Sequence, residues 1–198
     1  MKVVLASRNK KKCGEIAALL QPYQFELIPV SDFPNVPDVV ENGDTFAANA
    51  VLKATEVATA TGCWAIGEDS GLQVDALEGA PGIYSARYSG EHATDERNNK
   101  KLIANLQDVP PEKRGAGYCC SIAVADATGK VILTVEATCR GRITIEPRGT
   151  NGFGYDPYFL IPEYHQTFGE LTPLVKQHLS HRSRAFRKLI PLLLKERG

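Results

Sequence analysis

Two adjacent carboxylates, Glu68 and Asp69, come directly after a strand predicted over residues 64–67 and directly before Ser70 and Gly71. Adjacent carboxylates repel each other unless positive charge lies nearby, and carboxylate oxygens are preferred ligands of hard cations. With Mg²⁺ bound, one carboxylate can hold the metal while its neighbour accepts a proton from an attacking water. The pair therefore indicates a metal and a polyanionic substrate, and the alternative is a polar turn at a strand end.

A second polar segment, residues 7–12, has the sequence Ser-Arg-Asn-Lys-Lys-Lys and follows a short strand predicted over residues 2–6. A turn from a buried strand into a helix presents unpaired backbone amides at the positive end of the helix dipole, which favours phosphate. Ser7 and Asn9 add neutral donors, and Lys12 can reach over the first helical turn. We expect a phosphate site here, and a solvated, lysine-rich helix start is the alternative.

Polar residues recur every four positions at Glu41, Thr45, Asn49 and Lys53. This spacing places the last three on one face of a helix predicted over residues 45–61, with Glu41 just ahead of its first turn. Beside a binding site, Glu41 could hold a metal and Lys53 a phosphate. An exposed polar helix face would explain the same pattern.

Two later segments have the residue types that recognise a nucleotide base. In residues 153–156, Phe-Gly-Tyr-Asp, the glycine permits close approach to the backbone, Phe153 could stack on a base and Asp156 could accept hydrogen bonds. Lys176 and residues 180–182, Ser-His-Arg, supply donors, and an arginine, which only donates, favours a carbonyl at the purine 6-position. Core aromatics and a basic surface helix are the alternatives.

These residues must be positioned by alternating strands and helices. Apolar runs predict strands over residues 2–6, 25–29 and 64–67, and apolar residues at helical spacing predict a helix carrying Ile16, Leu19 and Leu20 and helices over residues 45–61 and 95–106. A hairpin is expected over residues 116–125 and 131–140, and a final helix, capped by Ser180, should kink or end at Pro191. This order predicts an α/β fold with some parallel pairing, in one domain over residues 1–198 with a cleft between two lobes.

The composition is that of a globular protein, with 198 residues of which 43% are hydrophobic and 23% charged. Lys and Arg number 23, as do Asp and Glu, and this neutral balance argues against a general nucleic-acid or membrane binder. The five cysteines lack metal-ligand spacing and are expected to be buried thiols in a reducing compartment, while His92, His165 and His178 are expected at the surface. No apolar run approaches the roughly 20 residues of a membrane span, and no signal-peptide core is visible, so the cytoplasm is the expected location.

Six segments, in order along nearly the whole chain, resemble the inosine triphosphate pyrophosphatase family, which cleaves deaminated purine nucleoside triphosphates. They are Ser7-x-Asn9-x-x-Lys12, the stretch from Glu41 through Thr45-Phe46 and Asn49-Ala50 to Lys53, Glu68-Asp69-Ser70-Gly71-Leu72, residues 79–88, residues 152–157 and Ser180-His181-Arg182. Each segment alone is moderately specific, whereas all six in this order are very specific.

The resemblance implies an elongated, two-lobed α/β fold around a mixed sheet with flanking helices, an active-site cleft between the lobes, and usually a homodimer. It also implies hydrolysis of dITP, ITP and XTP or dXTP to the monophosphate and pyrophosphate with Mg²⁺. The residues implied to grip the triphosphate are Ser7, Asn9, Lys12, Lys53 and Lys176. Glu41 and Asp69 would hold the metal, with Asp69 also the base for water. Phe153 would stack on the base, Asp156, His181 and Arg182 would line its edge, and Ser70, Gly154 and Tyr155 complete the implied substrate-binding set.

Two positions depart from the family pattern. Many bacterial members carry two aspartates where this chain has Glu68 and Asp69, so we assign the chemistry to Asp69 and a supporting role, with a possible metal contact, to Glu68. Residues 171–175 lack the acidic pair that often precedes the lysine matched by Lys176. Two other functions stay open: a pyrophosphatase for modified pyrimidine nucleotides, and a nucleotide-sensing or nucleic-acid-binding protein without catalysis.

Overall fold

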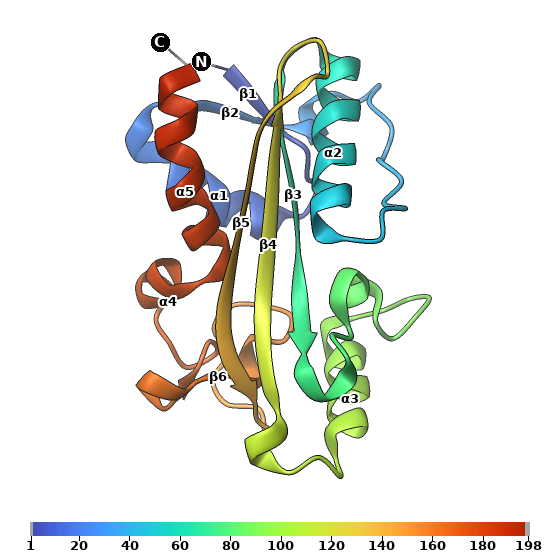
Figure 1. The fold of residues 1–198 in the computed structure, drawn as a ribbon, viewed down its shortest axis with the longest axis vertical. Helices are drawn as coiled ribbons and strands as arrows, with labels where there is room; N and C mark the ends of the chain where they lie inside the picture. The colour runs from blue at the N-terminus through green and yellow to red at the C-terminus, as the bar shows by residue number, and fades with distance from the viewer. Residues whose placement is uncertain (1, 197–198) are drawn as a thin grey trace. The chain divides into compact units, whose positions relative to one another are not determined.

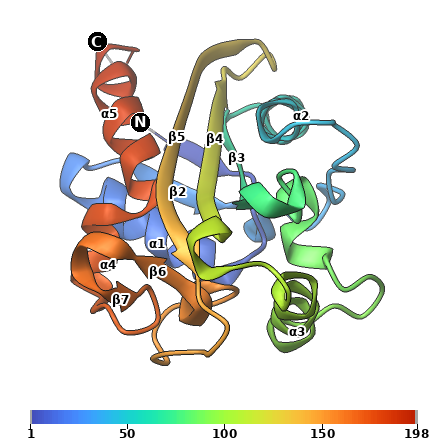
Figure 2. The same ribbon diagram turned by 60° about the horizontal axis from the view of Figure 1, so that its bottom comes forward.

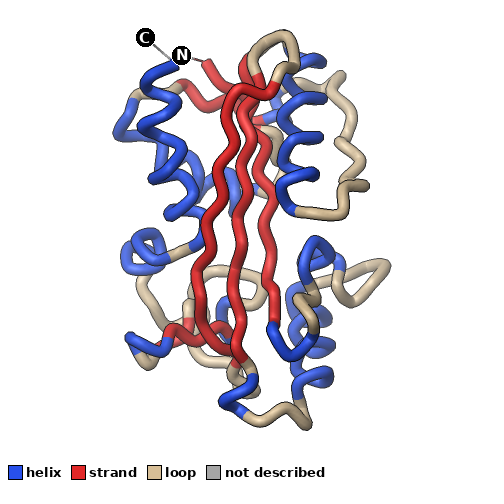
Figure 3. Tube along the Cα trace, in the orientation of Figure 1, coloured by secondary structure: helices blue, strands red, loops and turns tan. Residues whose placement is uncertain are grey.

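The computed structural model describes residues 2–196, which form a seven-stranded sheet with flanking helices (Figures 1 and 3). The strands, in chain order, are β1 (Lys2–Leu5), β2 (Glu26–Pro29), β3 (Trp64–Val74), β4 (Gly115–Ala125), β5 (Val131–Ile143), β6 (Phe159–Ile161) and β7 (Gln166–Thr167). The α-helices are α1 (Lys10–Leu20), α2 (Phe46–Thr61), α3 (Asp95–Leu106), α4 (Pro173–Leu179) and α5 (His181–Glu196).

The sheet has the order β2-β1-β3-β4-β5-β6-β7 and contains both kinds of pairing. β1 pairs in parallel with β2 and β3, with Val3 opposite Leu27 on one side and Trp64 on the other. β6 pairs antiparallel with both β5 and β7. The predicted α/β class with a mixed sheet is therefore confirmed.

The chain divides into two compact units. The first unit comprises Met1–Asp69, Cys120–Ala137 and Arg182–Gly198, and the second unit comprises Ser70–Cys119 and Thr138–His181. Strands β3, β4 and β5 contribute residues to both units. Each unit has its own hydrophobic core.

In the first unit, consecutive strand residues face different helices. Val3, Leu5 and Ile66 belong to a core cluster with residues of α1 and α5, whereas Val4 and Ala65 belong to a cluster with residues of α2. Side chains alternate between the two faces of a strand, so α2 covers one face and α1 with α5 covers the other. Figures 1 and 2 show this arrangement, with α2 and α5 on opposite sides of β3.

The core of the second unit is built around three aromatic rings. The centroid of Tyr118 lies 4.7 Å from that of Phe159, and Phe159 lies 5.0 Å from Phe168. Leu102 and Leu106 of α3 are fully buried in the same cluster. Aromatic groups of this kind supply much of the buried area of a small core.

Strand β3 ends at Val74, well beyond the predicted end at residue 67. The prediction was wrong because it took Gly71 as the start of a turn. Leu72 and Val74 are buried in the second core and alternate with the exposed Gln73, so the strand continues with a buried face of its own. The carboxylates of Glu68 and Asp69 therefore lie within a strand and not in a turn.

The helix boundaries follow local capping. The Oγ1 of Thr45 accepts a hydrogen bond from the backbone N of Ala48 (3.0 Å), and α2 ends at Gly62 in the left-handed conformation, with φ 64°. The predicted helix over residues 95–106 matches α3. α5 begins directly after Ser180 and continues through Pro191 to Glu196, so Pro191 does not end it. The short elements α4, β6 and β7 were not predicted.

All five cysteines and all four histidines lie within residues 2–196. None of the five cysteines forms a disulfide; Cys119, Cys120 and Cys139 are buried, and Cys13 and Cys63 are half-buried. His92, His165 and His178 are exposed, as predicted. Across the described part of the chain, every helix is too short or too polar to traverse a lipid bilayer.

Candidate active site

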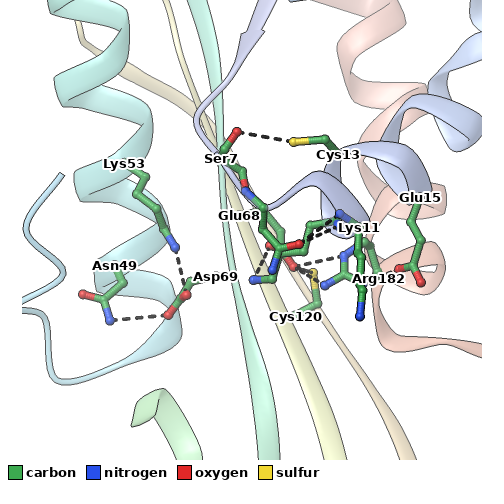
Figure 4. A network of polar contacts seen from close by, with 12 residues as sticks. Ser7, Lys11, Cys13, Glu15, Asn49, Lys53, Glu68, Asp69, Cys120 and Arg182 are labelled. Carbon is green, nitrogen blue, oxygen red and sulfur yellow. Dashed lines mark hydrogen bonds and ion pairs between the residues drawn. The ribbon is translucent and has the colours of Figure 1, made fainter. Parts of the chain in front are cut away.

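Glu68 and Asp69 are adjacent in β3 but point toward different helices. Glu68 contacts residues of α1 and α5, and Asp69 contacts residues of α2 (Figure 4). Both are buried, with 1% of Glu68 and 5% of Asp69 exposed. Since neighbouring strand residues face opposite sides of a sheet, the two carboxylates are separated and each has its own cationic partner.

Gly67 allows α2 to lie unusually close to β3. A Cβ atom at Gly67 would be 2.0 Å from the carbonyl oxygen of Ala50, a separation that no side chain could tolerate. This approach brings Asn49 and Lys53, which are one turn apart on α2, against Asp69. Because Gly67 has no side chain, α2 can pack closely enough on β3 to bring its polar residues to Asp69.

Lys53 joins two carboxylates of the first unit. Its Nζ lies 2.8 Å from Oδ1 of Asp69 and 3.3 Å from Oε1 of Glu41. The amide of Asn49 donates to Oδ2 of Asp69 (3.4 Å) and accepts from the backbone N of Gly43 (2.8 Å), which ties the preceding loop to α2. The structure therefore brings together Glu41, Asn49, Lys53 and Asp69, all singled out in the sequence.

Burial and mutual attraction both shift the pKa values of Asp69 and Lys53. Burial raises the pKa of Asp69 above its ordinary value, although the nearby Lys53 ammonium acts in the opposite direction. Burial alone would lower the pKa of Lys53, but the carboxylates of Asp69 and Glu41 outweigh it and raise that pKa. Lys53 is therefore a stable cation, and Asp69 has a higher proton affinity than an exposed aspartate, which suits a general base.

Glu68 is the centre of a second polar network. Its Oε2 accepts from Nζ of Lys12 (2.9 Å), and its Oε1 accepts from Nε (3.3 Å) and Nη2 (3.1 Å) of Arg182. The thiol of Cys120 donates to the same Oε1 (3.5 Å), and Nη1 of Arg182 also pairs with Glu15. A buried carboxylate requires such partners. Glu68 thus orients Lys12 and Arg182, and no sequence signal had pointed to Glu15 or Cys120.

The protonation states in this network are well defined. Burial would lower the pKa of Arg182, but the carboxylates of Glu68 and Glu15 raise it above its ordinary value. Burial, with the carboxylate of Glu68, raises the pKa of the Cys120 thiol well above its usual range. The network therefore combines a permanent cation with a neutral thiol.

The turn before α1 differs from the sequence expectation in one respect. Asn9 is the N-cap of α1, and its Oδ1 accepts from the backbone N of Lys11 (3.0 Å) and Lys12 (3.2 Å). The Oγ of Ser7 accepts from the backbone N of Asn9 (3.3 Å). Two of the amides that were expected to be unpaired, those of Lys11 and Lys12, are thus capped by a side chain and are not offered to a phosphate.

The residues expected at a nucleotide base lie mostly in the second unit, in a loop closed on Asp156. The Oδ2 of Asp156 accepts from the backbone N of Phe153 (2.8 Å) and from Nζ of Lys176 (2.6 Å). That Nζ also lies 4.9 Å from the ring centroid of Phe153. A Cβ at Gly152 would be 2.0 Å from Oδ2 of Asp156, so the loop needs glycine there. Lys176, expected at the triphosphate, is therefore paired with residues expected at the base.

Three other expected residues have structural contacts. The hydroxyl of Tyr155 donates to the carbonyl of Ser85 (2.7 Å), and burial raises the pKa of this tyrosine. The ring of His181 stacks on Tyr118, with centroids 4.7 Å apart and planes 10° from parallel. Ser70 is half-buried in β3, directly after Asp69. Tyr155 and His181 are thus anchored to the core of the second unit.

The first unit contains carboxylates that could hold a metal ion. Within residues 2–196, no three side chains of His, Cys, Asp or Glu form a group that could hold a metal. Glu41 and Asp69 nevertheless converge on one ammonium, that of Lys53. Mg²⁺ typically takes only one or two carboxylates and completes its shell with water and phosphate oxygens. This pair of oxygen donors therefore fits Mg²⁺.

Comparisons with known proteins agree with the geometry. The model of the Ham1 family matches residues 3–192. A dITP/XTP pyrophosphatase of Rhodopirellula baltica is 53% identical over 193 residues, covering 98% of this chain and 93% of that protein. A dITP/XTP pyrophosphatase of Geobacter sulfurreducens is 50% identical over 184 residues, covering 93% and 92%.

Solved structures give the same result. A HAM1 protein from Coxiella burnetii superposes with a TM-score of 0.91 at 39% identity, covering 98% of this chain and 99% of that one. The Ham1 protein of Staphylococcus aureus superposes with a TM-score of 0.87 at 35% identity over the whole of both chains. The family model matches nearly the whole of this chain, and the fold is shared with solved Ham1 proteins. The chain therefore belongs to the Ham1 family.

Proposed function

We propose that this protein hydrolyses deaminated purine nucleoside triphosphates, namely dITP, ITP and XTP or dXTP, to the monophosphate and pyrophosphate. The observation that carries the proposal is the buried carboxylate of Asp69, held 2.8 Å from Lys53 while Lys53 also contacts Glu41. Relatives of about half identity that match nearly the whole chain are dITP/XTP pyrophosphatases. Such an enzyme would remove deaminated nucleotides from the nucleotide pool.

The first unit supplies the groups for a triphosphate. Lys12 and Lys53 are proposed to bind phosphate oxygens, with Ser7 and Asn9 as neutral donors. Both lysines are held by buried carboxylates, so their ammonium groups are already positioned before substrate arrives. Preorganised cations stabilise the charge that develops on a departing pyrophosphate without further rearrangement.

Glu41 and Asp69 are proposed to hold a divalent metal, with Mg²⁺ the ion that fits best. When bound, Mg²⁺ would neutralise phosphate charge and polarise the phosphoryl group. Glu68 is not needed as a ligand, because its oxygens already accept from Lys12, Arg182 and Cys120. Removing the metal with a chelator should abolish turnover, and adding Mg²⁺ back should restore it.

Asp69 is proposed to act as the general base. In this step Asp69 takes a proton from water, the water oxygen forms a bond to the α-phosphorus, and the bond from that phosphorus to the bridging oxygen breaks. The electron pair of the broken bond leaves with pyrophosphate. The raised pKa of Asp69 supports this role, because a base with higher proton affinity removes the proton more readily.

Selectivity for the base is proposed to come from Phe153, Asp156, Lys176, His181 and Arg182. Phe153 is half-buried and could stack on a purine. The ammonium of Lys176 lies over the Phe153 ring and donates to Asp156. Arginine can only donate, so it matches the 6-carbonyl of hypoxanthine or xanthine and opposes the 6-amino group of adenine. Each unmatched buried donor costs about 1–3 kcal/mol, so several give strong discrimination.

The deciding assay measures pyrophosphate release from dITP, XTP and ATP with Mg²⁺. Release from dITP and XTP with little from ATP is the expected result. Equal rates on ATP would refute the selectivity, release of orthophosphate would place the cut at another bond, and turnover of modified pyrimidine nucleotides alone would favour that other class of pyrophosphatase.

We further propose that residues 1–198 act as a single pyrophosphatase domain, in the cytoplasm and as a homodimer. The near-complete coverage of full-length relatives supports a single functional domain. Light scattering coupled to size-exclusion chromatography tests the dimer, and a mass of about 43 kDa, twice the 21.6 kDa of one chain, is expected.

A further inference from the structure

Helix α3 holds the backbone of Gly154 from two sides. The backbone N of Gly154 donates to Oδ2 of Asp95 (2.9 Å), and Nδ2 of Asn99 donates to the carbonyl of Gly154 (2.9 Å). Asp95 and Asn99 are four residues apart and therefore share one face of α3. All three residues belong to the second unit.

The two hydrogen bonds fix the two peptide planes on either side of the Gly154 Cα atom. Asp95 binds the plane shared with Phe153, and Asn99 binds the plane shared with Tyr155. Glycine has more backbone freedom than any other residue, and Gly154 has φ 61°, in the left-handed region. A Cβ at Gly154 would meet no atom within 4 Å, so backbone conformation and not space is what this position requires.

The rest of the loop is anchored elsewhere. Tyr155 donates to Ser85, and Asp156 accepts from Lys176 and from the backbone of Phe153. The backbone N of Asp156 also donates to the carbonyl of Phe153 (3.2 Å), so Asp156 holds Phe153 from one side while α3 holds the two peptide planes at Gly154. The direction of the Phe153 side chain therefore depends on α3 together with Asp156.

Fold stability alone does not account for Asn99. Its side chain is buried, and within the described part of the chain its Oδ1 has no hydrogen-bond partner. A buried acceptor without a partner destabilises a folded protein, and an apolar residue of the same size would avoid that loss. What distinguishes Asn99 from such a residue is the bond from its Nδ2 to Gly154.

We propose that Asp95 and Asn99 are positioning residues that set the direction of the Phe153 ring and thereby the affinity and selectivity for the purine base. This inference rests on the proposed function, in which Phe153 stacks on that base. Neither residue is assigned contact with the nucleotide. Both act through the backbone of Gly154.

The test uses two variants with matched controls on the same helix. Asp95→Ala removes the acceptor, and Glu96→Ala, in the same first turn, removes an equal charge without contact to Gly154. Asn99→Leu removes the donor, and Asn105→Leu removes an α3 amide that donates instead to the hydroxyl of Tyr88. Because Asp95 is exposed, Asp95→Ala keeps the test available if Asn99→Leu fails to fold.

In each positioning variant, we expect KM for dITP to rise about tenfold, the preference for dITP over ATP to fall by a similar factor, and kcat to change little. Inhibition by inorganic tripolyphosphate, which has no base, should stay within about twofold of the wild type. If Asp95 and Asn99 had a merely structural role, KM for dITP and inhibition by tripolyphosphate would change together. The two control variants should change neither.

Amide hydrogen exchange at Gly154 separates the possible failures, because it does not require turnover. Exchange should accelerate in Asp95→Ala and not in Glu96→Ala. If the wild type released no pyrophosphate from dITP, the proposed function would fail. If exchange at Gly154 were unchanged in Asp95→Ala, the idea that α3 holds the Gly154 backbone would be refuted. Faster exchange with unchanged dITP preference in an active enzyme would overturn the positioning role alone.

Discussion

The carboxylates of Glu68 and Asp69 serve different partners because β3 continues through both residues. Asp69 faces α2 and binds Lys53 at 2.8 Å, whereas Glu68 faces α1 and α5 and binds Lys12 at 2.9 Å. Because side chains alternate between the two faces of a strand, these two neighbouring acids form separate ion pairs with different lysines. The two residues should consequently fail in different ways when they are changed.

For Asp69→Asn, we expect a loss of turnover with substrate affinity largely kept. The amide preserves the shape of the side chain and leaves Lys53 paired with Glu41, but it cannot take a proton from water, and general-base catalysis typically contributes about 10²- to 10⁴-fold. Steady-state kinetics with dITP and Mg²⁺ would show the fall in kcat. Asp75→Asn, an exposed aspartate that pairs with Arg140, is the control. Near wild-type turnover in Asp69→Asn would exclude Asp69 as the base.

For Glu68→Gln, we expect a loss of stability together with a rise in KM. The change leaves Arg182 and Lys12 without the charge that compensates them in a buried site, and breaking such pairs costs about 3–5 kcal/mol. For a chain of this length, the melting temperature should fall by roughly 6–20 °C. Thermal unfolding and the KM for dITP measure the two effects. Glu68→Asp keeps the charge on a shorter side chain and should be affected less; equal losses in both variants would contradict a charge effect.

Patterns in the sequence singled out several of the residues that meet around Lys53, but not the full length of the strand that carries Asp69. A helical spacing of four singled out Glu41 and Lys53, and an acidic pair after an apolar strand singled out Asp69, because both are local patterns; the family resemblance implied that the three act together. The length of β3 was not predicted, because Gly71 resembled a turn signal while the burial of Leu72 and Val74 depends on contacts with residues distant in sequence.

The partners of Glu68 illustrate the same limit. Arg182 is 114 positions away along the chain, and Glu15 and Cys120 have no spacing that links them to Glu68. Such pairs are set by the packing of α1 and α5 on the sheet, which no local pattern encodes. The role of Gly67 is likewise visible only once the distance to α2 is known.

Gly67→Ala should damage both stability and turnover. The new Cβ would overlap the carbonyl oxygen of Ala50, at 2.0 Å, and α2 would have to move away from β3. Overpacking of this kind costs about 1–3 kcal/mol, and the movement would also separate Lys53 from Asp69. Differential scanning calorimetry and kcat for dITP measure the two losses.

Gly14→Ala is the control for this substitution. A Cβ at Gly14, inside α1, would meet no atom within 4 Å. Replacing an interior helical glycine with alanine should stabilise the protein by about 0.5–1 kcal/mol. If Gly67→Ala were as stable and active as Gly14→Ala, the close approach of α2 would not be required for the site.

The pH profile of activity should report the environment of Asp69. A base must be deprotonated to act, so activity rises as pH increases through its pKa. Because kcat/KM reports the free enzyme and burial raises the pKa of its Asp69, the acid limb of kcat/KM, measured at Mg²⁺ concentrations too low to load the free enzyme, should lie above the value of about 3.9 typical of exposed aspartate. Lys53 favours the charged carboxylate and holds that pKa down, so Lys53→Met should move the acid limb to still higher pH. Lys130→Met, in the exposed turn between β4 and β5, should leave the limb in place. A limb that stayed fixed or moved to lower pH in Lys53→Met would show that Asp69 is not the group that titrates, whatever the size of the accompanying loss in affinity.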